Sequence, residues 1–279
     1  MRSHLVAIHV AVLLFGLSGL FAKLLMMSPL AIVWWRCLFA AVALGIVIRV
    51  RVKFTRPTLA IVGTGVLLAA HWVTFFHSIQ MSTVAIGLLS FSIFPVVVAL
   101  IEPLLDNEPF HRPSIIYALV ALGGVALVIP EFEVDSTGVR GAAWGVLSGG
   151  LYAIVIVMNR KFARHTSPLM IGLWQYVVAC LILTPFNLGT LPIDIRSFGL
   201  LALLGVVFTA GAHVLFIHGL RQVPARNAAL VGTLEPVYGV VAAALIIAET
   251  PSLRTLLSGA IIMLTVATAL HRGSPRSPF

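Results

Sequence analysis

Residues 75–108 read FFHSIQMSTVAIGLLSFSIFPVVVALIEPLLDNE, and residues 216–249 read FIHGLRQVPARNAALVGTLEPVYGVVAAALIIAE. The two stretches align without a gap at a separation of 141 positions. Identical pairs include Phe75 and Phe216, His77 and His218, Leu89 and Leu230, Pro95 and Pro236, Val96 and Val237, and Glu108 and Glu249. Further upstream, SPLAIVWW at 28–35 is matched by SPLMIGLW at 167–174, so the chain contains an internal repeat.

The composition places this repeat in a membrane. Of the 279 residues, 60% are hydrophobic and 10% are charged, whereas a soluble domain is about 45–50% apolar and about 25% charged. Ten apolar segments of about 17–22 residues are each long enough to cross a hydrocarbon core of about 30 Å. They lie near 5–25, 30–48, 58–78, 83–101, 113–130, 138–158, 168–186, 197–217, 227–247 and 253–270. We therefore expect an all-α membrane protein with ten transmembrane helices.

Each copy of the repeat holds five of these segments. Because five is odd, the second copy must cross the bilayer in the opposite direction to the first. We expect two inverted five-helix repeats, residues 1–134 and 135–279, which together form one integral membrane unit. Inverted repeats of this kind surround the substrate site of many secondary transporters, so the repeat indicates transport.

The basic residues predict the orientation. If the N-terminus is cytoplasmic, 13 of the 18 Lys and Arg fall on the cytoplasmic side. Four fall on the opposite side, namely Lys23, Arg140, Arg196 and Arg254, and Arg36 lies within a span. Cytoplasmic loops of membrane proteins carry an excess of Lys and Arg, so this distribution predicts that both termini are cytoplasmic.

The chain resembles the drug/metabolite transporter superfamily, specifically its bacterial ten-span type with two EamA-like repeats. The likeness is carried by FHS at 76–78, FSIFP at 91–95 and Glu108, and by IHG at 217–219, TLEP at 233–236 and Glu249. It covers about residues 4–270 and implies export of small polar metabolites across the bacterial inner membrane. The resemblance also implies a central cavity between the halves, and the aromatic amino-acid and paraquat exporters look closest.

Among the ionisable residues inside predicted spans, two stand out, Arg36 and Glu235. Such residues cost about 2.5–3.5 kcal/mol at the centre of a helix even on lenient insertion scales, and they often mark functional sites. Their predicted depths are close enough for a direct ion pair. The alternatives are that Arg36 snorkels to the outer headgroups and that Glu235 has a structural role inside the bundle.

Several side chains are predicted to line a substrate cavity. The ninth span carries small residues, Glu235 and Tyr238 on one stripe, and the fourth span carries a similar stripe. The resemblance adds the positions of Phe15, His71, Phe94 and Tyr152, although His71 and Phe94 are not the residues expected there. The full predicted set is Phe15, His71, Thr74, Phe91, Phe94, Tyr152, His213, Glu235 and Tyr238.

Two matched prolines, Pro95 and Pro236, lie within the fourth and ninth spans. Proline lacks a backbone donor and kinks a helix, so each is either a hinge or a fixed bend. On the sixth span, Gly141, Gly145 and Gly149 recur every four residues, which is the small-residue pattern of close helix packing.

The sequence predicts a secondary carrier that exports amino acids and similar small metabolites by alternating access. The alternatives are an exporter of lipophilic cations or drugs and, from other classes, an intramembrane enzyme or a channel. No GxxxxGK[ST] loop occurs, so ATP is not expected to drive transport directly. We expect no catalytic residue, no metal and no cofactor. Membrane lipids should surround the helices. A nucleic-acid partner is not expected, because the basic residues are scattered over the loops.

The driving force is left open by the sequence. Glu235 and His71 are the candidates for proton coupling because both are titratable and lie deep in the bilayer. A permanent pair between Glu235 and Arg36 would instead keep the carboxylate ionised. We favour facilitated diffusion, because Arg36 supplies that partner.

Overall fold

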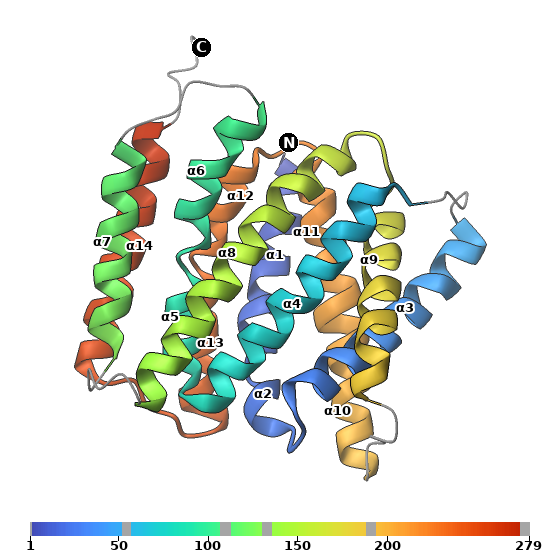
Figure 1. Cartoon of the computed structure of the whole chain (residues 1–279), viewed down its shortest axis with the longest axis horizontal. Coiled ribbons are helices and arrows are strands. Elements are labelled where there is room, and N and C mark those ends of the chain that lie inside the picture. The colour runs from blue at the N-terminus through green and yellow to red at the C-terminus, as the bar shows by residue number, and fades with distance from the viewer. Residues whose placement is uncertain (1, 52–56, 107–112, 130–135, 188–193, 274–279) are drawn as a thin grey trace.

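The computed structural model describes residues 2–51, 57–106, 113–129, 136–187 and 194–273, and every element within them is a helix (Figure 1). In chain order the elements are α1 (Arg2–Ser18), α2 (Phe21–Leu24), α3 (Pro29–Arg51), α4 (Leu59–Met81), α5 (Val84–Phe91), α6 (Phe94–Asp106), α7 (Pro113–Val128), α8 (Thr137–Ala163), α9 (Pro168–Leu183), η1 (Thr184–Phe186), α10 (Ile195–Gly205), η2 (Val206–Gly211), α11 (Ala212–Leu220), α12 (Ala225–Gly232), α13 (Glu235–Ile246) and α14 (Leu253–Gly273). The all-α membrane fold is confirmed.

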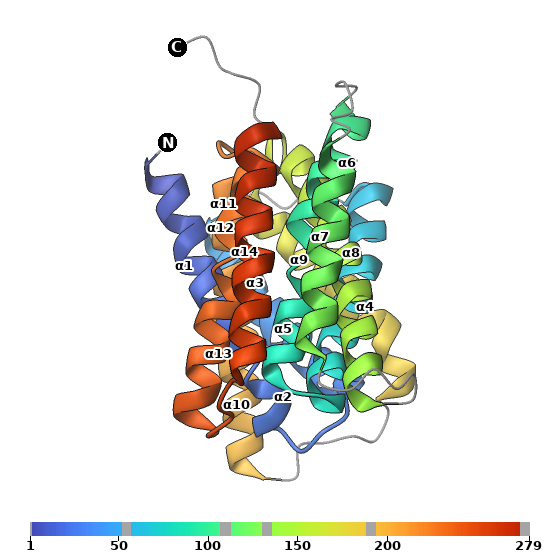
Figure 2. The same cartoon turned by 90° about the vertical axis from the view of Figure 1, so that its left-hand side faces the viewer.

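All ten predicted spans coincide with helical segments. Among the described residues, eight helical stretches are long and apolar enough to cross a membrane. The fifth and tenth spans correspond to α7 and α14, in which the apolar stretches whose side chains are described are Leu119–Val128 and Leu253–Thr268. These two helices pack against each other at one edge of the bundle (Figure 2).

The fourth and ninth spans are broken near their middles. α5 ends at Phe91 and α6 begins at Phe94, while α12 ends at Gly232 and α13 begins at Glu235. Pro95 and Pro236 are the second residues of α6 and α13. A proline is tolerated in the first turn of a helix because its missing N–H has no intrahelical partner there. Each proline therefore begins a new helix after a break.

The contacts between helices are equivalent in the two halves of the chain, since the first helix of each half packs against corresponding helices of the other half. α8 packs against α4, α5 and α6, and α1 packs against α11, α12 and α13. α3 packs against α9, and α7 against α14. In Figure 1, α1 begins at the top of the bundle, called the upper end below, whereas α8 begins at the opposite, lower end. The first helix of each half thus runs in the opposite direction to the other.

Glycines bring the first helix of each half close to the broken span of a neighbour. A Cβ at Gly149 of α8 would lie 2.6 Å from the carbonyl oxygen of Phe91, at the break of the fourth span. A Cβ at Gly16 of α1 would lie 2.6 Å from the carbonyl oxygen of Glu235, at the break of the ninth. Gly141 also faces close neighbours, in agreement with the packing role predicted for this stripe.

Candidate functional site

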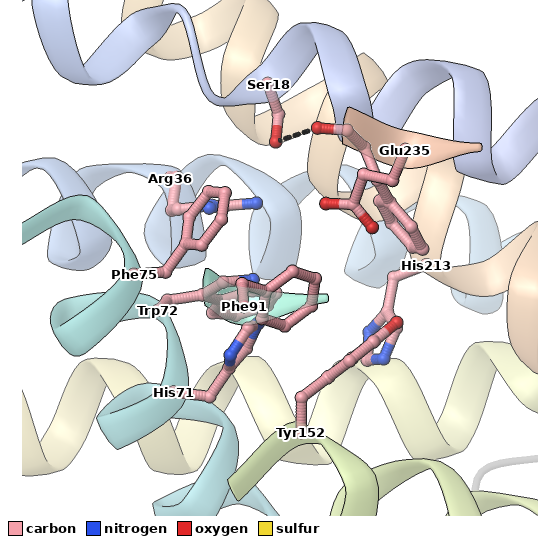
Figure 3. A pocket seen from close by; sticks show the side chains of 10 residues that line it. Ser18, Arg36, His71, Trp72, Phe75, Phe91, Tyr152, His213 and Glu235 are labelled. Carbon is pink, nitrogen blue, oxygen red and sulfur yellow. Dashed lines mark hydrogen bonds between the residues drawn. The ribbon is translucent and has the colours of Figure 1, made fainter. Parts of the chain in front are cut away.

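A small cavity lies inside the bundle, beside both helix breaks (Figure 3). Its lining consists of Phe15, Ser18, Arg36, His71, Trp72, Phe75, Phe91, Tyr152, His213 and Glu235. The cavity volume is about 20 Å³, which is room for one water molecule. A larger ligand therefore requires the lining side chains to move apart.

Arg36 projects from α3 into this cavity and is only 1% exposed. Its Nε donates a hydrogen bond to Oγ1 of Thr209 over 2.9 Å. The guanidinium carbon lies 4.2 Å from the ring centroid of Trp72, which is cation–π geometry. Arg36 is thus held inside the bundle, and the alternative that it snorkels to the headgroups does not describe this structure. Its terminal nitrogens donate to none of the described residues.

Glu235 is the first residue of α13, and its carboxylate faces the cavity from the break in the ninth span (Figure 3). A helix N-terminus carries partial positive charge, so α13 supports an anion at this position. Among the described residues, no side chain or backbone group hydrogen-bonds to the Glu235 carboxylate. It forms no salt bridge with Arg36, although both residues line the same cavity. The ion pair considered from the sequence is therefore absent here, because Arg36 is directed toward Thr209 and Trp72.

His71 on α4 is oriented by Ser148 on α8. Its Nδ1 lies 2.8 Å from Ser148 Oγ and 3.2 Å from the Ser148 carbonyl oxygen. Because a carbonyl oxygen can only accept, and because the Ser148 hydroxyl donates to the carbonyl oxygen of His71 over 3.1 Å, Nδ1 must carry the proton. The other ring nitrogen, Nε2, has no partner among the described residues.

Tyr152 on α8 closes one wall of the cavity. Its ring stacks on the imidazole of His71, with centroids 4.6 Å apart, and meets the edge of Phe15 at 6.5 Å. Within the described part of the chain, its buried hydroxyl has no hydrogen-bond partner. Leaving a buried hydroxyl unpaired costs about 1–3 kcal/mol, so a ligand or water that reached this group would gain stability.

The structure brings six of the nine predicted cavity residues to the lining: Phe15, His71, Phe91, Tyr152, His213 and Glu235. The other three lie just outside it. The Thr74 hydroxyl donates to the carbonyl oxygens of Ala70 and His71. Phe94 stacks behind Phe91 with centroids 4.9 Å apart, and Tyr238 packs beside Gly16 on α1.

A chain of hydrogen bonds leads from Arg36 into the neighbouring helices; all its links join side chains except one, in which the Tyr176 hydroxyl donates to the backbone carbonyl oxygen of Thr209. In order it comprises Thr209, Tyr176, His213, Asn159, Gln175 and Thr64. Thr209 belongs to η2, a π-helical turn of a kind often found at functional sites, and its hydroxyl donates to the carbonyl oxygen of Leu204. The chain holds Arg36 and His213 in fixed orientations.

Sequence reasoning missed Ser18, Trp72 and Phe75 in the lining and Ser148 and Thr209 behind it. Trp72 is an ordinary residue of an apolar span, and Phe75 was marked only by its identity with Phe216 in the repeat. Ser148 and Thr209 are small polar residues inside spans, which was a weak signal. Their partners lie 77 and 173 positions away in the sequence.

Matched polar contacts lie at the two ends of the bundle. At the upper end, Glu102 Oε1 accepts from the backbone N–H of Ala225, and Arg160 donates to the carbonyl oxygens of Leu220 and Val223. These contacts form the upper latch.

The lower latch mirrors the upper one. Glu249 Oε1 accepts from the N–H of Ala85, and Lys23 donates to the carbonyl oxygen of Ser82 over 2.7 Å. Ser82 and Val223 are 141 positions apart, the period of the repeat. Glu249 therefore caps the start of α5. Glu108, its partner in the sequence repeat, lies outside the described residues. Among the residues that are described, Glu102 makes the matching contact at the upper end.

The comparisons with known proteins agree with this arrangement. The chain matches the EamA-like transporter family over residues 2–129 and again over 139–270. An "Uncharacterized transporter" from Archaeoglobus fulgidus is 26% identical over 216 residues and 77% of each chain. Another, from Synechocystis sp., is 29% identical over 77% of this chain and 67% of that protein.

A third relative, an uncharacterized transporter from Bacillus subtilis, is 23% identical over 94% of this chain and 88% of its own. A solved crystal structure shares the fold, with a TM-score of 0.73 over 98% of both chains at 17% identity. The predicted superfamily is confirmed, while the nearness to aromatic amino-acid and paraquat exporters stays a prediction. The chain therefore belongs to the EamA-like transporter family and is a multi-pass membrane transporter.

Proposed function

We propose that the protein is a secondary carrier that exports amino acids and similar small zwitterions across the bacterial inner membrane by alternating access. One observation carries this proposal. Arg36 and Glu235, a base and an acid, line the same cavity, and their terminal atoms are not paired with each other. The carboxylate of an amino acid would bind Arg36, and its ammonium group would bind Glu235.

The electrostatic argument favours a ligand that carries both charges. A buried charge is costly unless it is paired, and attraction between charges strengthens as water is excluded. A zwitterion would pair Arg36 and Glu235 at once and add no net charge to the cavity. An amine or a carboxylic acid alone would leave one of the two residues unpaired.

The second candidate is an exporter of organic cations. The aromatic rings of Phe15, Phe91 and Tyr152 lie on the same cavity as Glu235, and such rings attract cations. The guanidinium of Arg36 opposes this reading because it would repel a second cation in the same small space. Transport of an amine in preference to the amino acid would favour the second candidate.

The two latches support alternating access. Each latch includes one hydrogen bond between the halves, from Glu102 to Ala225 or from Glu249 to Ala85. Releasing one latch while the other holds would open the cavity to one side only. Pro95 and Pro236, at the breaks beside the cavity, are the proposed hinges.

The inverted relation of residues 1–134 and 135–279 is part of this proposal. The unchanged pattern of helix pairs and the two separate family matches support it. We place the upper end in the cytoplasm, together with both termini, because the positive-inside rule favours that side.

Two energy sources for transport are compatible with the proposed function, facilitated diffusion and proton coupling. Facilitated diffusion was favoured because Arg36 could keep Glu235 permanently ionised, and that pairing is absent in this state. Proton coupling at Glu235 therefore competes with it on equal terms. The two are separated by measuring whether a pH gradient drives accumulation in liposomes, and whether Glu235→Gln loses accumulation while keeping exchange.

Counterflow in proteoliposomes tests the proposed function. A panel would compare labelled amino acids with the amines and the acids that lack one of the two charged groups. We expect saturable counterflow of zwitterions, reduced at least tenfold in both Arg36→Gln and Glu235→Gln. Uptake that neither saturates nor exchanges would indicate a channel, and equal transport of the amines would overturn the zwitterion assignment. Chemical change of the substrate would indicate an enzyme.

A further inference from the structure

We infer that His71 selects amino acids whose side chain donates a hydrogen bond, and that Ser148 positions it to do so. This inference rests on the proposed function, because it assigns the third contact of a ligand already held at Arg36 and Glu235. The chemical class is a small amino acid with a hydroxyl or primary amide side chain.

The tautomer of His71 supplies the selecting group. With its proton fixed on Nδ1 by Ser148, the neutral ring presents the lone pair of Nε2. His71 lines the cavity, and Nε2 has no partner among the described residues. It can therefore accept a hydrogen bond from a ligand, but it cannot donate one.

The imidazole is also held in place mechanically. Its ring stacks on Tyr152 at 4.6 Å with an interplanar angle of 22°, and Phe91 lies at 5.4 Å. A ring clamped by Tyr152, Phe91 and Ser148 has little freedom to turn Nε2 away. An acceptor fixed in this way loses its hydrogen bond to water when the cavity closes over an apolar side chain.

The remaining wall sets the size. Around His71, the lining is formed by the rings of Trp72, Phe75 and Phe91 (Figure 3). In the closed state the cavity holds about 20 Å³, so a bulky side chain would demand the largest displacement of these rings. Serine, threonine and asparagine combine a small side chain with a donor.

The test compares side chains of equal shape. We would measure kcat/KM for threonine against valine, and for serine against alanine, in proteoliposomes. The expected preference is about 10- to 100-fold for the member that carries a hydroxyl. If the wild type transported valine and threonine with equal kcat/KM, the inference would be overturned, while the proposal of a zwitterion carrier would stand. If no amino acid is transported, the proposed function itself fails.

Variants separate selection from a structural role. His71→Phe keeps a ring but removes the acceptor, and it should bring the threonine-to-valine ratio close to one. His71→Gln retains an acceptor and should retain part of the preference. Ser148→Ala should lower the ratio by releasing Nδ1, whereas a merely structural effect would lower transport of both substrates equally. An unchanged ratio in His71→Phe, shown to be folded by its thermal melting, would refute the inference.

Discussion

Replacing Glu249 by glutamine should open the cavity at the lower end. The Glu249 carboxylate accepts the N–H of Ala85 over 3.2 Å, at the first turn of α5. A hydrogen bond to a charged group is worth about 1.5–3 kcal/mol, and a carboxylate gains about 0.3–1 kcal/mol at a helix N-terminus. An amide keeps an acceptor but loses the charge, so we expect a net loss of about 1–2 kcal/mol. That loss corresponds to a shift of about 5- to 30-fold in the population of the open state.

The matched variant is Glu102→Gln at the upper end. Its carboxylate accepts the N–H of Ala225 over the same distance, 3.2 Å, at the first residue of α12. The same loss should therefore favour opening to the opposite side. Because the two hydrogen bonds are alike, the double variant should restore the balance between the two open states. It should also increase the populations of both open states relative to the closed state.

Accessibility of a single cysteine reports these populations. Ser18 lines the cavity and can be changed to cysteine after Cys37 and Cys180 are replaced by alanine. A membrane-impermeant maleimide would then be added to right-side-out and to inside-out vesicles. We expect Glu249→Gln to raise the labelling rate about 5- to 30-fold from the outside only.

Labelling from the inside should rise in Glu102→Gln only. If both single variants change labelling equally from both sides, the latches do not act as separate gates. If neither changes it in a folded protein, the two carboxylates are merely helix caps.

Three further perturbations follow from the packing and the polar contacts. Gly149→Ala should destabilise the detergent-solubilised protein by about 1–3 kcal/mol in thermal unfolding, because its Cβ would lie 2.6 Å from a backbone oxygen. Gly150→Ala is the control and should not destabilise the protein, because the space around Gly150 is open. Thr209→Val should raise KM for a zwitterion while leaving the melting temperature nearly unchanged, because it frees Arg36 to move. Transport kinetics equal to those of the wild type would show that Arg36 is held by other contacts. Hydrogen bonds from Ser197 hold the pKa of Asp194 below its usual value, so their stabilisation is present at neutral pH and is lost as the pH falls through that lowered pKa. Asp194→Ala should therefore have a lower melting temperature than the wild type at pH 7. A difference in melting temperature that persisted unchanged at pH 3 would contradict this.

The helices and their breaks could be predicted from the sequence because their causes are local. Each span is a run of apolar residues of sufficient length, and α6 and α13 begin one residue before Pro95 and Pro236. The spacing of four residues likewise placed the glycines of α8 on one face. None of these features depends on which helices become neighbours.

The partners of the charged residues depend on tertiary packing and could not be predicted. Arg36 and Glu235 were identifiable because an ionisable residue in an apolar span is rare. That Arg36 turns to Thr209 depends on η2 lying beside α3, across 173 positions of sequence. Among the described residues, the carboxylate that matches Glu249 across the bundle is Glu102, which the repeat did not mark.

The repeat itself suggests where selectivity resides. Features that close and bend the bundle occur twice: a glycine at each helix crossing, a proline after each break, and a carboxylate in each latch. The charged groups of the cavity occur once. At the separation of 139 positions Arg36 corresponds to Gln175, and at 141 positions Glu235 corresponds to Phe94. A duplicated device can work on either side of the membrane in turn, whereas one ligand in one central cavity needs only one partner for each of its charges. Under the proposed function, substitutions at the single-copy positions should change which substrate is carried, and substitutions at the duplicated positions should change how fast the carrier turns over.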